Sequence, residues 1–287
     1  MKIRVLENTV VEGSVRWAGE VMELDRPTVI QLERQELVER VNEEDYEDRM
    51  DDRYPNLTPQ PPSLKGKGEI KDIMVFTPVY RLEPETVEAV LALEWDGAIT
   101  WVFQRDNPQE IIGDLARSGD ARKAGILNHL HQYKRGRETF LQGRYDAMLI
   151  VESDMIPPRD ALTRLAAVPA DVIYGVYRFR ASDVINIFEL YPGTPRNIGE
   201  SLSIHPHLLK RAVKLGVYPC SGAGFGCTLI RRRVLERLEL RIDERNSAHC
   251  DTYFSTDVLR AGFRQAAEMR VVCGHKNTNG EVLWPRL

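Results

Sequence analysis

Two acidic side chains, Glu152 and Asp154, stand directly behind the apolar run MLIV at residues 148–151. The run is typical of a buried strand, and Pro157 and Pro158 end it sharply. Two carboxylates two positions apart at a strand end lie on one side of the chain, where they could bind a hard divalent cation and share it with substrate phosphates. An acidic loop that only caps the next helix fits this pair of residues equally well.

Further polar residues are expected near the same place, because ligands of open α/β sheets bind beyond the carboxyl ends of the strands. Thr77, Pro78 and Tyr80 end an earlier apolar run, and they offer a hydroxyl, a turn and a ring on which a nucleotide base could stack. An ordinary strand-to-helix turn is the alternative there. Asn107 follows a second run, and Arg137 belongs to a basic helix that leads into the third.

These residues need a sheet to position them, and the pattern from residue 70 onward predicts one. Short apolar runs alternate with segments of helical period, which is typical of an α/β layer fold with a mostly parallel or mixed sheet. Strands are predicted at residues 70–79, 98–104, 145–153, 171–179, 221–230 and 269–274, and helices at 120–141, 231–238 and 253–261. The first of these helices is expected to pack on the sheet through Ala124, Leu127, Leu130, Tyr133, Arg137 and Leu141.

The first 69 residues have a different pattern. Residues 1–41 alternate in short runs around Gly13 and Gly19, which predicts a small β-rich module with one helical stretch at 27–35. Residues 42–69 are acidic and then rich in Pro, Gly and Lys, so they cannot bury enough apolar surface to fold and are predicted to be a linker. Residues 70–287 then form the main domain.

The composition is that of a globular protein, with 43% hydrophobic and 29% charged residues. No apolar run approaches the roughly 20 residues that span a bilayer, and no signal-peptide core follows the charged start, so we expect a cytoplasmic protein with no membrane span. The net charge is −4, and residues 1–69 hold 10 Lys and Arg against 16 Asp and Glu. Basic clusters at residues 134–137 and 231–233 permit a nucleic-acid substrate without indicating one.

The cysteines give a further indication about the compartment. The sequence has four of them and no CxxC pair, which argues against a disulfide framework and favours buried thiols. They are Cys220, Cys227, Cys250 and Cys273. The alternative is a zinc site, although structural zinc ligands usually come at tighter spacings than those of His249, Cys250, Cys273 and His275.

The segment that contains the two acids resembles a known family. A helix that carries Arg137 precedes the string YDAMLIVESD at residues 145–154. This arrangement resembles the DxD segment of the GT-A glycosyltransferases, with Glu152 in place of the usual Asp. The resemblance implies a Rossmann-like, GT-A nucleotide-binding domain in which Asp154 is a direct metal ligand and Ser153 lies beside the nucleotide.

Three later segments resemble landmarks of the same family in the same order. The string PCSGAGFG resembles the strand and turn beside the donor sugar, which implies donor contacts at Gly222 and Gly224. The string HCDTYFS resembles the segment with the catalytic aspartate of inverting members, which is Asp251 here, with Cys250 in place of the usual Glu. The string VVCGH resembles the late strand whose histidine, His275, completes the metal site.

The resemblance, which covers about residues 70–280, implies the metal-dependent transfer of a sugar from a nucleotide sugar. Mn²⁺ or Mg²⁺, held by Glu152, Asp154 and His275, is expected to neutralise the diphosphate leaving group. Asp251 is expected to act as the general base on an acceptor hydroxyl, and the product has the inverted anomeric configuration.

The acceptor is less constrained by the sequence. The string VRWAGEVMELD at residues 15–25 resembles a small N-terminal module of tailed-phage proteins, which with the basic clusters suggests a hydroxymethylpyrimidine base of phage DNA. Polysaccharide or protein is the other possible acceptor. Arg178 and Arg180 could face donor phosphate, the acceptor or solvent. The competing functions are a non-catalytic phage structural or adaptor protein and a nucleotidyltransferase, which would release pyrophosphate.

Overall fold

The computed structural model describes residues 70–79, 81–105, 108, 121–180, 182–190, 198–242 and 249–287, with the backbone alone at 121–123 and in five short strands before residue 41. The chain divides into two compact units, Met1–Asn56 with Tyr191–Pro195 and Leu57–Leu190 with Arg196–Leu287. The predicted linker at 42–69 and the predicted helix at 27–35 lie outside the described residues.

The described backbone of the first unit forms short antiparallel strands. β1 (Lys2–Val5) pairs with β4 (Val21–Glu23) on one side and with β5 (Val38–Arg40) on the other. β2 (Thr9–Val11) pairs with β3 (Ser14–Arg16). All five strands fall within the segment whose alternating pattern predicts a β-rich module.

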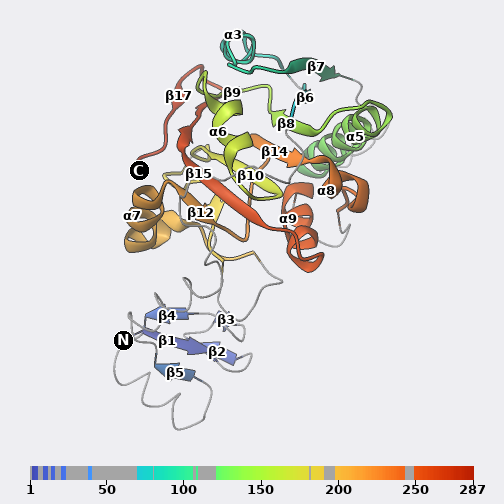
Figure 1. The fold of residues 1–287 in the computed structure, drawn as a ribbon. Helices are drawn as coiled ribbons and strands as arrows, with labels where there is room; N and C mark the ends of the chain where they lie inside the picture. The colour runs from blue at the N-terminus through green and yellow to red at the C-terminus, as the bar shows by residue number, and fades with distance from the viewer. Residues whose placement is uncertain are drawn as a thin grey trace. The chain divides into compact units, whose positions relative to one another are not determined.

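A seven-stranded sheet forms the centre of the second unit, in the order β12-β15-β10-β14-β8-β6-β7 (Figure 1). Strand pairs β10–β15, β6–β8 and β6–β7 are parallel, whereas β14 is antiparallel to β10 and β8, and β12 is antiparallel to β15. The predicted α/β fold with a mixed, mostly parallel sheet is therefore confirmed, and it is consistent with a Rossmann-like arrangement. The strands are β6 (Asp72–Pro78), β7 (Ala98–Gln104), β8 (Ala147–Val151), β10 (Val172–Val176), β12 (Val217–Pro219), β14 (Cys227–Arg231) and β15 (Gln265–Val272).

Helices of the described chain pack against the strands of this sheet. α5 packs against β6, β7, α8 and α9, while α6 packs against β10, β14 and β15, and α7 against β12 and β15. A short helix, α3, has Pro84 in its first turn, where the missing N–H costs nothing. The helices are α3 (Pro84–Leu91), α5 (Ala121–Gln142), α6 (Ala161–Ala167), α7 (Pro206–Leu215), α8 (Arg232–Arg237) and α9 (Cys250–Arg260), with a 3-10 turn, η1, at Leu202–Ile204.

Both faces of the sheet are covered, which explains why its central strands are continuously apolar. Every residue of β8 is fully buried. Side chains alternate along β6, where Val75 belongs to the apolar cluster that includes Leu162 of α6. The next residue, Phe76, instead packs against Tyr133 of α5, with ring centroids 6.0 Å apart. Helices α5 and α6 therefore lie on opposite faces of the sheet.

Helix α5 buries a face that is rotated from the predicted one. Ala124 and Tyr133 are buried as expected, but the other four predicted contacts are only partly buried. The buried face includes amides, and Gln132 Nε2 donates to a backbone carbonyl beyond the end of β6 at 3.1 Å. It also includes Gly136, where a Cβ would lie 2.5 Å from the Phe76 ring. The helix packs on the sheet as predicted, but the prediction was wrong for these four side chains because hydrogen-bonded amides and a glycine carry no apolar signal.

A small three-stranded sheet brings a late segment of the chain to the end of β8. β16 (Gly274–Lys276) pairs with β9 (Met155–Ile156), the strand that directly follows Asp154. In this register His275 lies opposite Met155. The topology thus places residues far apart in sequence beside each other. The other short strands are β17 (Val282–Leu283), which pairs with β16, and β11 (Ile187–Phe188), which pairs with β13 (Gly222–Ala223).

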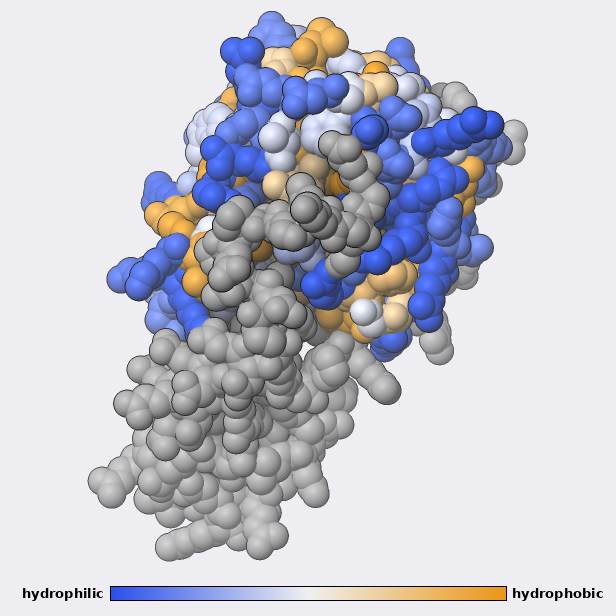
Figure 2. All heavy atoms as spheres, viewed as in Figure 1, coloured by the Kyte–Doolittle hydropathy of each residue, from blue (hydrophilic) through white to orange (hydrophobic). Residues whose placement is uncertain are grey.

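Apolar side chains on the surface of the second unit are scattered. On the coloured part of Figure 2, hydrophobic residues are interspersed with hydrophilic ones. The most exposed large apolar residues, Leu91, Ile204 and Trp284, belong to α3, η1 and the segment after β17. Such isolated exposure is ordinary for a globular surface. Within the described part of the chain, the helices are too short or too polar to cross a membrane.

Candidate functional site

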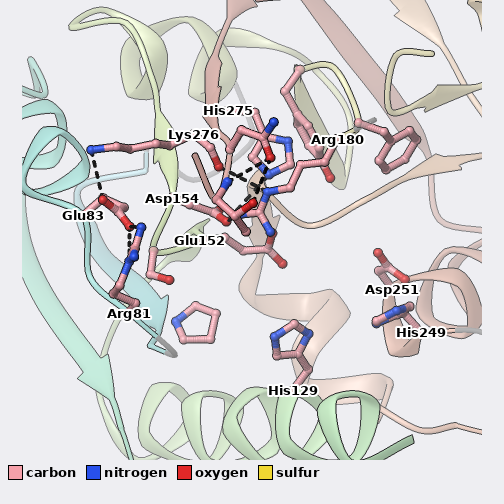
Figure 3. A pocket seen from close by; sticks show the side chains of 16 residues that line it. Arg81, Glu83, His129, Glu152, Asp154, Arg180, His249, Asp251, His275 and Lys276 are labelled. Carbon is pink, nitrogen blue, oxygen red and sulfur yellow. Dashed lines mark hydrogen bonds and ion pairs between the residues drawn. The ribbon is translucent and has the colours of Figure 1, made fainter. Parts of the chain in front are cut away.

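A pocket of about 440 Å³ opens beyond the carboxyl ends of β6, β8 and β10, where ligands of α/β sheets commonly bind (Figure 3). Charged and aromatic side chains converge on it from segments that are distant in sequence. Its lining comprises Pro78, Arg81, Glu83, His129, Glu152, Ser153, Asp154, Tyr177, Phe179, Arg180, His249, Asp251, His275, Lys276, Asn277 and Thr278.

Asp154 and His275 form the centre of this pocket. His275 Nδ1 lies 2.8 Å from the carbonyl oxygen of Arg178, so we assign its proton to this nitrogen, which donates to the carbonyl. The other nitrogen, Nε2, then presents a lone pair and lies 3.7 Å from Asp154 Oδ2. Burial lowers the pKa of His275 and so favours the neutral ring. An anchored, neutral imidazole beside a carboxylate is an arrangement that suits a metal ligand.

Arg180 closes over the same carboxylate. Its Nη2 forms an ion pair with Asp154 Oδ2, and its Nε donates to the carbonyl oxygen of Lys276 at 3.2 Å. The Arg180 side chain is 40% exposed, whereas that of Asp154 is 20% exposed. The guanidinium therefore lies at the open side of the pocket and neutralises a carboxylate deeper inside.

Two further cations line the pocket and are held by carboxylates. Lys276 Nζ lies 2.5 Å and 2.6 Å from the two oxygens of Glu85, and 3.0 Å from Glu83 Oε2. Arg81 Nε donates to Glu83 Oε1 at 2.5 Å. The hydrogen bond from Lys276 lowers the pKa of Glu83, and burial opposes this effect only in part. We call Arg81, Arg180 and Lys276 the cationic wall.

Glu152, the first of the two acids, has a different neighbour. The hydroxyl of Tyr133 donates to Glu152 Oε1 at 2.5 Å. Burial, and next the charge of Glu152, raise the pKa of Tyr133, so the phenol keeps its proton and remains a donor. The carboxylate is thus oriented by α5, and one of its oxygens is already engaged.

Asp251 lies in the first turn of α9, across the pocket from Arg81 and Glu83 in Figure 3. Its Oδ1 accepts a hydrogen bond from the backbone N–H of Thr252 at 2.7 Å. Burial raises the pKa of Asp251, and the negative charge of Glu152 raises it further. A carboxylate that holds its proton more tightly than usual, in a pocket, is suited to general-base chemistry.

Two histidines accompany Asp251. The rings of His129, from α5, and His249, directly before α9, lie with their centroids 6.0 Å apart. Burial lowers the pKa of His129, and the charge of Asp251 opposes this effect. We call His129, His249 and Asp251 the Asp251 wall.

The donor set tests whether a metal ion fits this pocket. Asp154 and His275 offer a carboxylate oxygen and an imidazole nitrogen close together, a pair that suits a divalent cation such as Mn²⁺. Within the described residues, however, no three His, Cys, Asp or Glu side chains are grouped so as to hold a metal. Glu152 lines the pocket without completing the predicted set of three. A cation here would therefore take its other ligands from phosphate oxygens and water.

The other residues predicted to bind the nucleotide sugar are distributed unevenly. Pro78 and Ser153 line the pocket. Thr77 is fully buried, and its hydroxyl accepts a hydrogen bond from Trp101 Nε1 at 3.0 Å. Tyr80 and Asn107 lie outside the described residues.

The remaining three predicted contacts lie near the pocket or away from it. Arg137 Nε donates to the carbonyl oxygen of Leu235 at 2.8 Å, so this arginine joins α5 to α8 and points away from the pocket. Gly222 lies under α9, where a Cβ would be 2.4 Å from that of Ser255. Gly224 is nearer, since a Cβ there would lie 2.1 Å from the Tyr177 hydroxyl and 3.5 Å from Asp251 Oδ2.

Sequence reasoning did not identify Arg81, Glu83, His129, Tyr177 or Lys276 as lining residues. Lys276 directly follows the predicted ligand His275, and Arg81 directly follows the predicted contact Tyr80, so adjacency in sequence is the available signal for these two. The other three depend on where strands end and how α5 approaches the sheet, which are non-local features.

The four cysteines are free and buried, as predicted. Cys227 and Cys273 lie side by side in the core, where a hydrogen bond from the Cys273 thiol to Cys227 and burial both raise the pKa of Cys273. The alternative zinc site of His249, Cys250, Cys273 and His275 is not assembled, since no such cluster is found among the described side chains.

Comparison with known proteins gives similar solved structures but no family. No protein-family model matches the chain, and a search of curated proteins gives no match. Among solved structures, A197 from STIV is similar to this chain, with 13% sequence identity and a TM-score of 0.46, over 75% of this chain and 95% of that chain. The functional interpretation therefore depends on the geometry of the pocket.

Proposed function

We propose that the second unit is a metal-dependent glycosyltransferase of the GT-A type, which transfers a sugar from a nucleotide sugar to an acceptor hydroxyl with inversion. One observation supports this most: a single pocket holds the cationic wall beside Asp154 and His275 and, across from Arg81, the carboxylate of Asp251 with its raised pKa. The first group suits an anionic diphosphate, and Asp251 suits the removal of a hydroxyl proton.

The donor diphosphate would bind at the cationic wall. Lys276 and Arg81 are held in place by Glu83, and Arg180 extends from the opposite side of Asp154. Asp154 and His275 would hold the divalent cation, which when bound supplies positive charge to the leaving diphosphate. The same three basic side chains would stabilise the negative charge that develops there.

In the transfer step, Asp251 accepts the proton of the acceptor hydroxyl. The acceptor oxygen forms a bond to the anomeric carbon, and its proton passes to the Asp251 carboxylate. The bond between the anomeric carbon and the diphosphate oxygen breaks, and its electron pair leaves with the diphosphate. Because attack and departure occur on opposite faces of that carbon, the configuration is inverted. The raised pKa of Asp251 makes its carboxylate a stronger base than an ordinary aspartate.

The test is a donor screen with the full chain, Mn²⁺ and a panel of nucleotide sugars, with release of nucleoside diphosphate as the readout. Asp154→Ala is expected to abolish release, and Asp251→Asn to abolish transfer while nucleotide binding persists. Absence of release with every donor would refute the proposal. Release of pyrophosphate from a nucleoside triphosphate would instead support the nucleotidyltransferase.

For the acceptor, we propose DNA with hydroxymethylpyrimidine bases, with polysaccharide and protein as alternatives. This choice rests on the sequence of the first 41 residues, and the basic clusters permit it. Activity on modified DNA should fall steeply with added salt, because DNA binding releases counterions. Activity that is indifferent to salt would point to one of the other acceptors.

A further inference from the structure

Arg180 lies at the tip of a short hairpin that follows β10. Arg178 forms an isolated antiparallel bridge with Ile185, and the N–H of Phe179 donates to the carbonyl oxygen of Val184 at 2.9 Å. The backbone on both sides of the tip is thus fixed. From this position the long side chain of Arg180 extends to Asp154.

The neighbouring arginine shows that this contact is particular to Arg180. Arg178 Nη2 lies 3.0 Å from Asp183 Oδ1, and its Nε donates to the carbonyl oxygen of Ser182 at 2.5 Å. These contacts keep Arg178 within its own hairpin. Of the two arginines in the string YRFR, only Arg180 lines the pocket.

The partner atom of Arg180 is the one that a metal ion would use. The guanidinium pairs with Asp154 Oδ2, and this same oxygen faces His275 Nε2 at 3.7 Å. A divalent cation held by Asp154 and His275 would meet the positive charge of Arg180 at the same carboxylate. Two cations at one carboxylate oxygen repel each other strongly where solvent is partly excluded.

Arg180 is also more able to change partners than Lys276, the other basic residue beside Asp154. Lys276 is bound by two carboxylates, Glu83 and Glu85, and its side chain is 12% exposed. Arg180 is 40% exposed and has Asp154 as its acidic partner. A guanidinium binds phosphate oxygens bidentately, so a diphosphate in this pocket would compete with Asp154 for it.

We propose that Arg180 competes with the divalent cation for Asp154, and that a nucleoside diphosphate draws Arg180 away. The cation and the nucleotide then bind cooperatively, since each is favoured by the rearrangement that the other requires. This inference rests on the proposed function for the identity of the two ligands, and it concerns their binding, not the transfer step. Arg180 is here a residue that sets metal affinity.

The test measures Mn²⁺ binding to the full chain by electron paramagnetic resonance, alone and with UDP, GDP, ADP, CDP or dTDP. Wild type should bind Mn²⁺ weakly alone and about tenfold or more tightly with the correct diphosphate. Arg180→Met should bind Mn²⁺ alone about tenfold more tightly than wild type, and the diphosphate should improve binding by a smaller factor. Asp154→Asn in the Arg180→Met background should reverse this gain.

Arg81→Met is the matched control. It removes one positive charge from the same pocket, but Arg81 pairs with Glu83 and does not contact Asp154 in the structure. Its effect on Mn²⁺ affinity should be smaller than that of Arg180→Met. Equal effects of the two variants would overturn the inference, as would unchanged affinity in Arg180→Met or no Mn²⁺ binding by either wild type or Arg180→Met.

Thermal unfolding checks that Arg180→Met folds. Arg180→Lys keeps the positive charge without the forked guanidinium, and it should give an intermediate Mn²⁺ affinity.

The outcome can be separated from that of the transferase proposal. A chain that transfers no sugar but shows metal–nucleotide coupling through Arg180 would retain this inference and reject the enzyme. If the chain is an active transferase and its Mn²⁺ affinity is the same in wild type and Arg180→Met, this inference alone is rejected.

Discussion

The two walls of the pocket differ in how their charged side chains are paired. On the cationic wall each basic group has an acidic partner, so that Arg81 pairs with Glu83, Lys276 with Glu83 and Glu85, and Arg180 with Asp154. On the Asp251 wall burial instead works against ionisation. Burial, and next the charge of Glu152, raise the pKa of Asp251, and burial lowers the pKa of His129.

This difference suits the two walls to different tasks. The charges of the cationic wall are paired with one another, and an anion would bind there by an exchange of ionic partners. The Asp251 wall holds acid–base groups away from their ordinary protonation equilibria, as is common at catalytic centres. Substitutions on one wall should therefore impair diphosphate binding, and substitutions on the other should impair transfer.

The largest expected effect is on the Asp251 wall. Asp251→Asn should lower the rate of transfer about 10²- to 10⁴-fold, because an amide cannot accept the acceptor proton. Nucleoside diphosphate affinity should stay near that of wild type, since the cationic wall is intact. Asp257→Asn is the control, because Asp257 lies on the same helix but pairs with Arg241 outside the pocket lining. Measured transfer in Asp251→Asn close to that of Asp257→Asn would contradict the assignment.

The next effect concerns the cationic wall. Lys276→Met should weaken nucleoside diphosphate binding about 10- to 100-fold, the value of a charge-assisted hydrogen bond, while Asp251 keeps its environment. Calorimetric titration of the diphosphate with Mn²⁺ present measures this loss. Arg135→Met removes an exposed cation that pairs with Glu138 on α5, and it should leave the affinity unchanged. If both variants weaken binding equally, the effect is one of net charge and not of this wall.

A third substitution should disturb both walls through Tyr177. The Tyr177 ring lies against His275, with centroids 5.4 Å apart, and a Cβ at Gly224 would come 2.1 Å from its hydroxyl. Gly224→Ala should therefore lower the free energy of unfolding by about 1–3 kcal/mol and weaken both metal binding and transfer. Gly125→Ala is the matched control, because nothing lies within 4 Å of its Cβ and a helix gains about 0.5–1 kcal/mol from the exchange. Denaturant unfolding of the two variants should show opposite signs.

The smallest expected effect is on stability. Because folding raises the pKa of Asp251, the folded chain binds this proton more tightly than the unfolded chain does. The ionised carboxylate therefore costs stability at neutral pH, and the cost decreases once pH falls below the folded pKa and is gone below the unfolded pKa. Asp251→Asn should raise the free energy of unfolding at pH 7 by roughly 0.5–2 kcal/mol, and by less in acid. A variant less stable than wild type at pH 7 would show that Asp251 is not under electrostatic strain.

The sequence predicted most of the sheet because apolar periodicity is a local property. The strand predicted at 98–104 matches β7 residue for residue, and the apolar run before Glu152 forms β8. Asp154, His275 and Asp251 reach one pocket because each follows or begins an element at the carboxyl edge of the sheet. The rule for strand ends is enough to place such residues.

The residues that sequence reasoning missed depend on non-local geometry. Lys276 enters the pocket because β16 pairs with β9, which no local pattern reveals. Arg137 was expected at the nucleotide, but the phase of α5 directs it to the carbonyl of Leu235. The sequence gives no reason to place Arg180 rather than Arg178 in the pocket. Their different ion pairs around the hairpin distinguish the two residues.

The buried thiols give this pocket a built-in reporter. Cys227 lies opposite Val151 at the end of β8, and Cys273 directly precedes β16, so both lie beneath the residues that line the cavity. A thiol reagent can reach them only when this part of the fold opens transiently. Their labelling rate therefore measures how often the floor of the pocket opens, and ligands that bind the closed form should slow it. In a background where Cys220 and Cys250 are replaced, this rate would report pocket opening without any assay of catalysis.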